Sequence, residues 1–229
     1  MKAHSQKFRL VTLVIGTMFV VLAMNFAPAL AQLEKLHPVD TADENAEFYT
    51  FRLRLIEAVV ARDTEFISAQ MDENIKLSFG GYVGVEDFKK MWQPDEPNSK
   101  VWSLLARILG GGGSFQGDKY FEAPYWSAAW PDKFDPYEHG AIIGNKVNAR
   151  AAPSLKADVL TRLSYDVVKV HNWHVADEIT QKAKWVEVDL SDDQKAYVWE
   201  DYIKSANDYR IGFEKVDGRW KMKWFLAGD

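Results

Sequence analysis

The sequence predicts an α+β protein, in which a helical N-terminal region is completed by a C-terminal β-hairpin and a small all-β domain is inserted between them. Three observations lead to this prediction. Apolar residues recur at helical spacing over much of residues 45–109. Short alternating runs separated by turns fill residues 140–205. Residues 209–226 form two further alternating runs around Asp217-Gly218, a dipeptide typical of hairpin turns.

The first 31 residues have the features of a secretory signal peptide. A basic start is followed by an apolar run over residues 10–24 and by Ala29-Leu30-Ala31, a small-x-small cleavage signal. We expect cleavage after Ala31 and a periplasmic or secreted protein. The alternative is an uncleaved membrane anchor, because no charged residue interrupts residues 10–32.

Composition limits the classes of partner and chemistry. The chain has no cysteine, which excludes disulfides, thiolate metal sites and a cysteine nucleophile. Its formal net charge is −5, and removing residues 1–31 would leave 25 Lys+Arg against 33 Asp+Glu, or −8. An acidic protein is a poor ligand for phosphate backbones and for anionic lipids. We therefore expect no nucleic-acid partner, and membrane contact only through an uncleaved N-terminal segment.

Residues 33–109 are expected to form a linker, a set of amphipathic helices and one strand. The linker covers residues 33–44 and the strand covers residues 75–79, where apolar and polar residues alternate. Asp63 and Ser99 are the expected caps of two of the helices. The expected helices begin near residue 45 and then cover 64–71, 85–92 and 100–109.

Two unusual stretches follow these helices. The glycine run 110–113 lacks the lysine and Ser/Thr of a phosphate-binding loop and follows a helix, so we expect a helix stop and a loop. Residues 115–138 are rich in aromatic residues and proline. We expect them to pack over an open edge of the core, although a ligand-stacking wall is the alternative.

The C-terminal hairpin is expected to pair with the N-terminal region. Its apolar face carries Trp220, Met222, Trp224 and Leu226, and burying each is worth roughly 1.5–3 kcal/mol. A lone hairpin is marginal in water, and the N-terminal helices lack a sheet. We therefore expect a host domain of residues 32–138 plus 206–229, with residues 139–205 as a small inserted barrel.

The inserted region resembles the bacterial Src-homology-3 (SH3b) family. The stretch 147–154 (VNARAAPS) is similar to the family's Asn-x-Arg strand running into a proline-containing turn. Residues 158–163, 165–170 and 185–188 resemble the strands that follow it, in the same order. Ala196-Tyr197-Val198 stands where the family usually shows Gly-Trp-Val, which is a departure from the pattern.

The resemblance implies a binding module for cell-wall peptide, glycan or protein. Asn148, Arg150 and Pro153 would mainly shape the fold of such a module. Aromatic residues would make the ligand contacts, and the candidates are Trp173, Tyr197 and Trp199.

No catalytic or metal-binding motif is recognisable in the sequence. His171 and His174 are three residues apart, but they lie in an expected strand-end loop without an evident third ligand. We therefore expect no metal and no cofactor, and a non-catalytic binding protein of the cell envelope. The alternative is a host domain that binds or hydrolyses a small molecule in a pocket lined by Trp92, Trp102 and the aromatic residues of 120–137.

Overall fold

The computed structural model of the chain describes residues 33–117, 120–191 and 194–228. The predicted signal segment and its cleavage site lie outside these residues. Of the described residues, 27% are in helices and 38% are in strands, which form two mostly antiparallel sheets, so the predicted α+β class is confirmed. Within the described ranges, no helix combines the length and the apolar character needed to cross a lipid bilayer.

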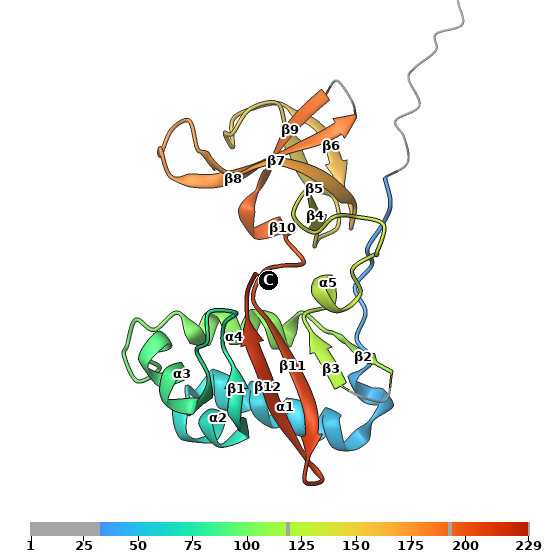
Figure 1. Cartoon of the computed structure of the whole chain (residues 1–229). Coiled ribbons are helices and arrows are strands. Elements are labelled where there is room, and N and C mark those ends of the chain that lie inside the picture. The colour runs from blue at the N-terminus through green and yellow to red at the C-terminus, as the bar shows by residue number, and fades with distance from the viewer. Residues whose placement is uncertain (1–32, 118–119, 192–193, 229) are drawn as a thin grey trace, which may run out of the picture. The chain divides into compact units, whose positions relative to one another are not determined.

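The first sheet has five strands in the order β1-β12-β11-β3-β2 (Figure 1). Strand β12 pairs in parallel with β1, and β11 pairs antiparallel with both β12 and β3. The C-terminal hairpin therefore lies in the middle of a sheet whose other strands come from residues 71–123. The strands are β1 (Met71–Lys76), β2 (Ser114–Gln116), β3 (Tyr120–Ala123), β11 (Arg210–Val216) and β12 (Arg219–Leu226).

Helices from the N-terminal half pack on this sheet. Asn45 and Asp63 cap the first two α-helices by accepting hydrogen bonds from the backbone N–H groups of Phe48 (3.0 Å) and Phe66 (2.8 Å). The Phe48 ring lies 4.4 Å from that of Phe121 and 5.5 Å from that of Phe213, centroid to centroid. The helices are η1 (Ala42–Glu44), α1 (Ala46–Ala61), α2 (Thr64–Gln70), α3 (Gly84–Trp92), α4 (Val101–Gly110) and α5 (Tyr125–Ala128).

The hairpin has the predicted turn, and three of the four residues of its predicted apolar face, Trp220, Met222 and Leu226, are buried. Asp217 and Gly218 both have positive φ (49° and 77°), as the tight turn requires. A bulge follows, because the partners change from Phe213↔Met222 to Gly212↔Trp224 and skip one residue of β12. Beyond the bulge Phe225 is fully buried and Trp224 is only half-buried. The expectation that Trp224 continues the buried row was therefore wrong.

Three other expectations for the N-terminal half were also wrong. The strand expected at residues 75–79 lies at Met71–Lys76, because the Leu77 N–H donates to the Tyr82 carbonyl (3.0 Å) and begins a turn. The N-cap residue of helix α4 is Lys100 rather than the expected Ser99, although the Ser99 hydroxyl still accepts a long hydrogen bond from the Val101 N–H (3.4 Å). The expected linker 33–44 is packed: the Leu36 N–H donates to the Tyr165 carbonyl (2.7 Å), and η1 ends the segment.

The aromatic stretch 115–138 contains secondary structure that the sequence did not reveal. Strands β2 and β3 and helix α5 lie in or next to it, so residues 71–123 supply three strands to the five-stranded sheet rather than one. Phe121 is fully buried, whereas Phe115 is half-buried against the same core. Tyr125 and Trp126 pack in a smaller cluster with Leu36.

The second sheet has seven antiparallel strands in the order β10-β4-β7-β8-β9-β5-β6. The expected closed barrel is not found in the described residues, because β6 pairs only with β5 and β10 only with β4. The strands are β4 (His139–Ile142), β5 (Val147–Arg150), β6 (Val159–Leu163), β7 (Val167–Ala176), β8 (Ala183–Ser191), β9 (Gln194–Trp199) and β10 (Ile203–Lys204).

Candidate functional site

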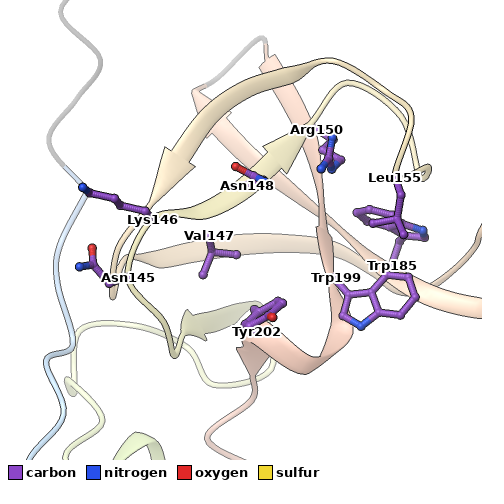
Figure 2. A pocket seen from close by; sticks show the side chains of 9 residues that line it. All are labelled: Asn145, Lys146, Val147, Asn148, Arg150, Leu155, Trp185, Trp199 and Tyr202. Carbon is purple, nitrogen blue, oxygen red and sulfur yellow. The ribbon is translucent and has the colours of Figure 1, made fainter.

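A surface groove of about 400 Å³ lies on the seven-stranded sheet (Figure 2). One wall is formed by the β4–β5 turn and strand β5, and strand β5 contains the Asn-x-Arg motif. The other wall comes from β8, β9 and the short 3-10 helix η2 (Glu200–Tyr202), and the loop after β5 adds one residue. The lining consists of residues 145–148, Arg150, Leu155, Trp185, Trp199 and Tyr202.

Two tryptophans form the aromatic end of the groove. Trp185 is fully buried and donates its indole N–H to Asp177 Oδ2 (2.9 Å). This bond, together with backbone N–H groups of the same loop, holds the pKa of Asp177 below its ordinary value. Trp199 stands edge-on to Trp185, with ring centroids 5.3 Å apart, and donates its own N–H to Asp201 Oδ2 (3.0 Å). The Trp199 ring is thus held in a defined orientation.

Two apolar side chains at the groove are open to solvent. Leu155 is 65% exposed and Tyr202 is 51% exposed. Large apolar groups with this exposure, beside a fixed indole, offer surface that a ligand could bury.

The charged side chains that line the groove are both basic. Arg150 is half-buried and donates from Nη1 to the Ala157 carbonyl (2.7 Å), while Lys146 is exposed at the rim. In the part of the chain that the structure describes, neither forms an ion pair with a carboxylate. A further cation, Arg162, donates to Asn148 Oδ1 (3.2 Å). The groove is therefore basic although the protein is acidic.

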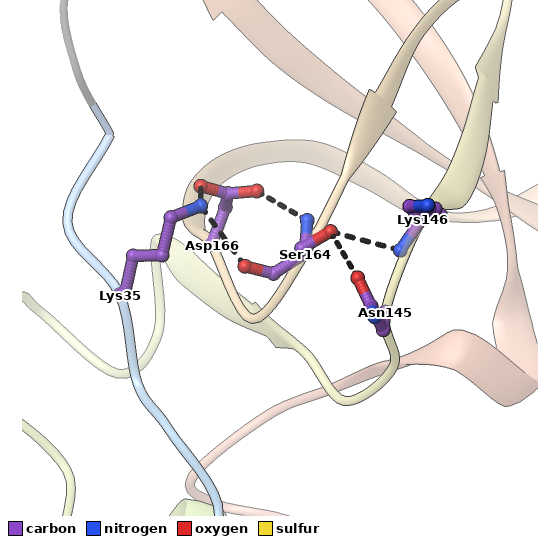
Figure 3. A network of polar contacts seen from close by, with 5 residues as sticks. All are labelled: Lys35, Asn145, Lys146, Ser164 and Asp166. Carbon is purple, nitrogen blue, oxygen red and sulfur yellow. Dashed lines mark hydrogen bonds and ion pairs between the residues drawn. The ribbon is translucent and has the colours of Figure 1, made fainter.

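A polar network holds the turn at the other end of the groove (Figure 3). Ser164 Oγ accepts from the Lys146 backbone N–H (2.8 Å) and donates to Asn145 Oδ1 (2.9 Å). The Ser164 N–H donates to Asp166 Oδ2 (2.6 Å), and Asp166 is ion-paired with Lys35. The segment just after the predicted cleavage site is thus connected to the rim of the groove.

The structure brings one of the three expected ligand contacts into the groove. Trp199 lines it. Tyr197 lies on the same face of β9 as Trp199, but it is paired with Arg150 in the sheet and does not line the groove. Burial, and secondarily the nearby Glu187 carboxylate, raise the pKa of the Tyr197 hydroxyl. Trp173 packs over Gly140, where an added Cβ would lie 2.8 Å from its ring.

Sequence reasoning missed most of the groove-lining residues. Arg150 was interpreted as a residue that shapes the fold, and its hydrogen bond to the Ala157 carbonyl, which holds the loop after β5, is consistent with that interpretation. Leu155 and Tyr202 carried no motif. Leu155 could have been identified as a groove residue from its position just after the turn at Pro153. Tyr202 could have been identified from its spacing of three residues from Trp199.

The aromatic residues expected to line a pocket in the host domain are divided between separate places. Trp102 is buried and donates its N–H to the Pro94 carbonyl (2.9 Å). Trp92 lines two surface pockets of about 400 and 370 Å³. Tyr125 and Trp126 line a larger open pocket of about 600 Å³ beside the glycine run. Burial raises the pKa of Tyr125 to about 12, so its hydroxyl stays protonated at neutral pH.

The histidine pair lies in a strand rather than in the expected loop. His171 and His174 belong to β7, and His171 Nε2 lies 2.6 Å from Asp189 Oδ1. Within residues 33–117, 120–191 and 194–228, no group of three His, Asp or Glu side chains is arranged to hold a metal ion.

No protein-family model, no curated protein and no solved structure matches this chain significantly. The groove is accordingly interpreted from its own geometry and chemistry.

Proposed function

We propose that the protein is an exported, non-catalytic binding protein of the bacterial cell envelope. Its groove on the seven-stranded sheet would contact cell-wall peptide or glycan, or a protein partner. The observation that carries this proposal is the position of the groove: residues 145–148 and Arg150, which include the Asn and Arg of the Asn-x-Arg motif, form one wall, and Trp199 lies in the other. The motif that resembles SH3b modules therefore lies at a groove with apolar and cationic side chains that could contact a ligand.

We further propose that residues 139–205 are an SH3-like module inserted into a host of residues 32–138 plus 206–229. The pairing of the first and last strands of this region supports the insertion. Ile203 of β10 is the partner of Ile142, and Lys204 is the partner of Ala141. An insertion needs its two ends close together, and this pairing supplies that geometry.

The chemistry of the lining favours binding over catalysis. It contains aromatic, aliphatic, amide and cationic side chains, but no carboxylate, histidine or hydroxyl other than the Tyr202 phenol. General acid–base catalysis and nucleophilic attack need such groups in hydrogen-bonding reach of each other. Apolar surface with a few polar groups is instead typical of recognition sites.

Sedimentation with purified cell-wall sacculi tests the proposal. The wild-type chain should co-sediment at low salt, and the double variant Leu155→Ala/Tyr202→Ala should stay in the supernatant. Both side chains are more than half exposed, so the change should leave the fold intact. Ile179→Ala and Tyr82→Ala, at 61% and 54% exposure outside the groove, serve as matched controls. Failure of the wild-type chain to co-sediment would refute a cell-wall ligand.

A second function is supported by the open pocket beside the glycine run. Tyr125 and Trp126 line it, and the buried Tyr125 hydroxyl and Trp126 N–H have no hydrogen-bond partner among the described residues. If a Trp126→Phe variant lost a ligand that the Leu155→Ala/Tyr202→Ala variant retained, this pocket would be the functional site.

A further inference from the structure

We infer that the groove binds an extended acidic peptide, with one carboxylate at Arg150, an apolar side chain between Leu155 and Trp199, and a second anionic group near Lys146. This inference rests on the proposed binding function and specifies its ligand. It follows from the charge of the lining, the length of the groove wall and the form of its aromatic surface.

The charge of the lining selects an anionic ligand. Among the described residues, neither Arg150 nor Lys146 forms an ion pair with a carboxylate. The nearby Asp201 is engaged by the Trp199 N–H and Glu200 by Lys184. Arg150 uses one guanidinium nitrogen for the Ala157 carbonyl, so further donors remain for a carboxylate.

The spacing of the two cations matches a short extended peptide. Lys146 immediately precedes β5 and Arg150 ends it. At a rise of about 3.3 Å per residue, these positions are about 13 Å apart, the length of roughly four residues of extended chain. In Figure 2 Lys146 extends outward from the end of the groove opposite the indoles, so it would meet the far end of such a ligand.

The aromatic surface favours a peptide over a sugar. A sugar ring stacks on an open, flat aromatic face. Here Trp185 is fully buried and Trp199 is half-buried and edge-on to it. The accessible apolar groups are the aliphatic Leu155 and the ring of Tyr202, which suit an apolar side chain.

Lys146 occupies a backbone conformation that lysine seldom adopts. Its φ is 56°, in the left-handed region where glycine or asparagine would be easier to accommodate. The Ser164 hydroxyl holds this conformation through the Lys146 N–H. A charged residue kept at a strained, exposed position on the groove rim is consistent with a binding role for its side chain.

Two synthetic peptides test the inference on the full chain. One is an acetylated tetrapeptide with glutamate at its first and fourth positions and leucine at its second; the other has glutamine in place of both glutamates. Fluorescence anisotropy of labelled peptides should show at least tenfold tighter binding of the acidic peptide at 50 mM salt, and a much smaller preference at 500 mM salt. Arg150→Gln and Lys146→Asn should each weaken the acidic peptide about fivefold to tenfold and leave the glutamine peptide unchanged.

Arg219→Gln provides the charge-matched control, because this exposed cation lies in the other sheet, on β12. Asparagine suits the left-handed backbone of Lys146, so Lys146→Asn remains informative even if Arg150→Gln fails to fold. Equal affinity for the two peptides, or no measurable binding of either at millimolar concentration, would overturn the inference. So would binding of a cell-wall oligosaccharide in their place. Sacculus binding that depends on Leu155 and Tyr202 but not on charge would leave the proposed function standing and remove only the acidic ligand.

Discussion

Truncating Phe213 to alanine should sharply destabilise the five-stranded sheet and the helices that cover it. Phe213 lies on β11, near the C-terminus of the chain, and is fully buried. Its ring centroid lies 5.5 Å from Phe48 and 5.9 Å from Phe51, both on α1, and 6.4 Å from Phe121 on β3. One side chain from the C-terminal hairpin thus contacts the first α-helix and the middle of the chain.

The magnitude follows from the cavity that the substitution would leave. Phe→Ala in a closed core destabilises by about 3–5 kcal/mol, a large part of the roughly 5–15 kcal/mol that stabilises a typical domain. A double-mutant cycle with Phe48→Ala should show a coupling energy of about 0.5–1.5 kcal/mol, because the two rings are in edge contact.

Urea unfolding would measure the loss, and hydrogen exchange with mass spectrometry would locate it. Protection should fall in residues 46–61 and persist in residues 183–191, which belong to the other sheet. Val60→Ala, at a position 79% exposed on α1, should change the free energy of unfolding by less than about 0.5 kcal/mol. A loss below about 1 kcal/mol for Phe213→Ala, or zero coupling to Phe48, would refute the packing argument.

Three further predictions concern single positions. Gly212→Ala should destabilise by about 1–3 kcal/mol or more in urea unfolding, because its new Cβ would lie 1.8 Å from Trp224 Cζ2; a neutral effect would contradict this. Burial raises the pKa of Asp72, but hydrogen bonds from Lys223 and from the Asn74 N–H outweigh burial, so the pKa is lowered overall. The ionised Asp72 therefore stabilises the fold above about pH 4, and this stabilisation is lost as the pH falls through the folded-state pKa. Asp72→Asn should therefore flatten the stability–pH curve in acid, and an unchanged slope would count against the ion pair. Burial, and secondarily Arg107, lowers the pKa of Lys204, but its ammonium group donates to the Glu200 carbonyl (2.8 Å) and offsets the charge of the buried Asp208, so Lys204→Met should lower Tm by about 2–4 °C in calorimetry, whereas a rise would contradict the argument.

Local patterns predicted the elements that depend on local chemistry. The hairpin turn at Asp217-Gly218 needs two residues with positive φ, and few other dipeptides supply them so readily. The cap at Asp63 needs a short side-chain acceptor, and the structure shows it accepting from Phe66. The pairing of the hairpin with the N-terminal half followed from a simple physical requirement, since each had an apolar face to bury.

Apart from the hairpin's partner, features that depend on long-range pairing were not predictable from the sequence. Strands β2 and β3 are short, and their aromatic residues have no alternation that separates a strand from a packed loop. The bulge between Gly212 and Phe213 changes which β12 residues face the core, and it is a property of how the two strands are paired.

The groove residues also divide into those that the sequence indicated and those that only the fold brings together. Trp199 was a candidate because the family resemblance drew attention to exposed aromatic residues near the end of the module. Leu155 and Tyr202 reach the groove only because β5, β9 and the segments after them lie together in the sheet. Lys146 directly precedes the Asn-x-Arg strand in the sequence, but its left-handed backbone and lack of an acidic partner become visible only in three dimensions.

The most direct test of the binding groove is the indole N–H spectrum of the ¹⁵N-labelled protein during titration with soluble cell-wall peptides. Trp199→Phe would assign the Trp199 signal, and Trp102, whose N–H is bound to the Pro94 carbonyl in the core of the other sheet, serves as the internal reference. If the ligand binds in the groove, the Trp199 signal should shift saturably during the titration while the Trp102 signal stays unchanged. A titration that leaves Trp199 unmoved, or that shifts the Trp126 signal in its place, would contradict binding in the groove.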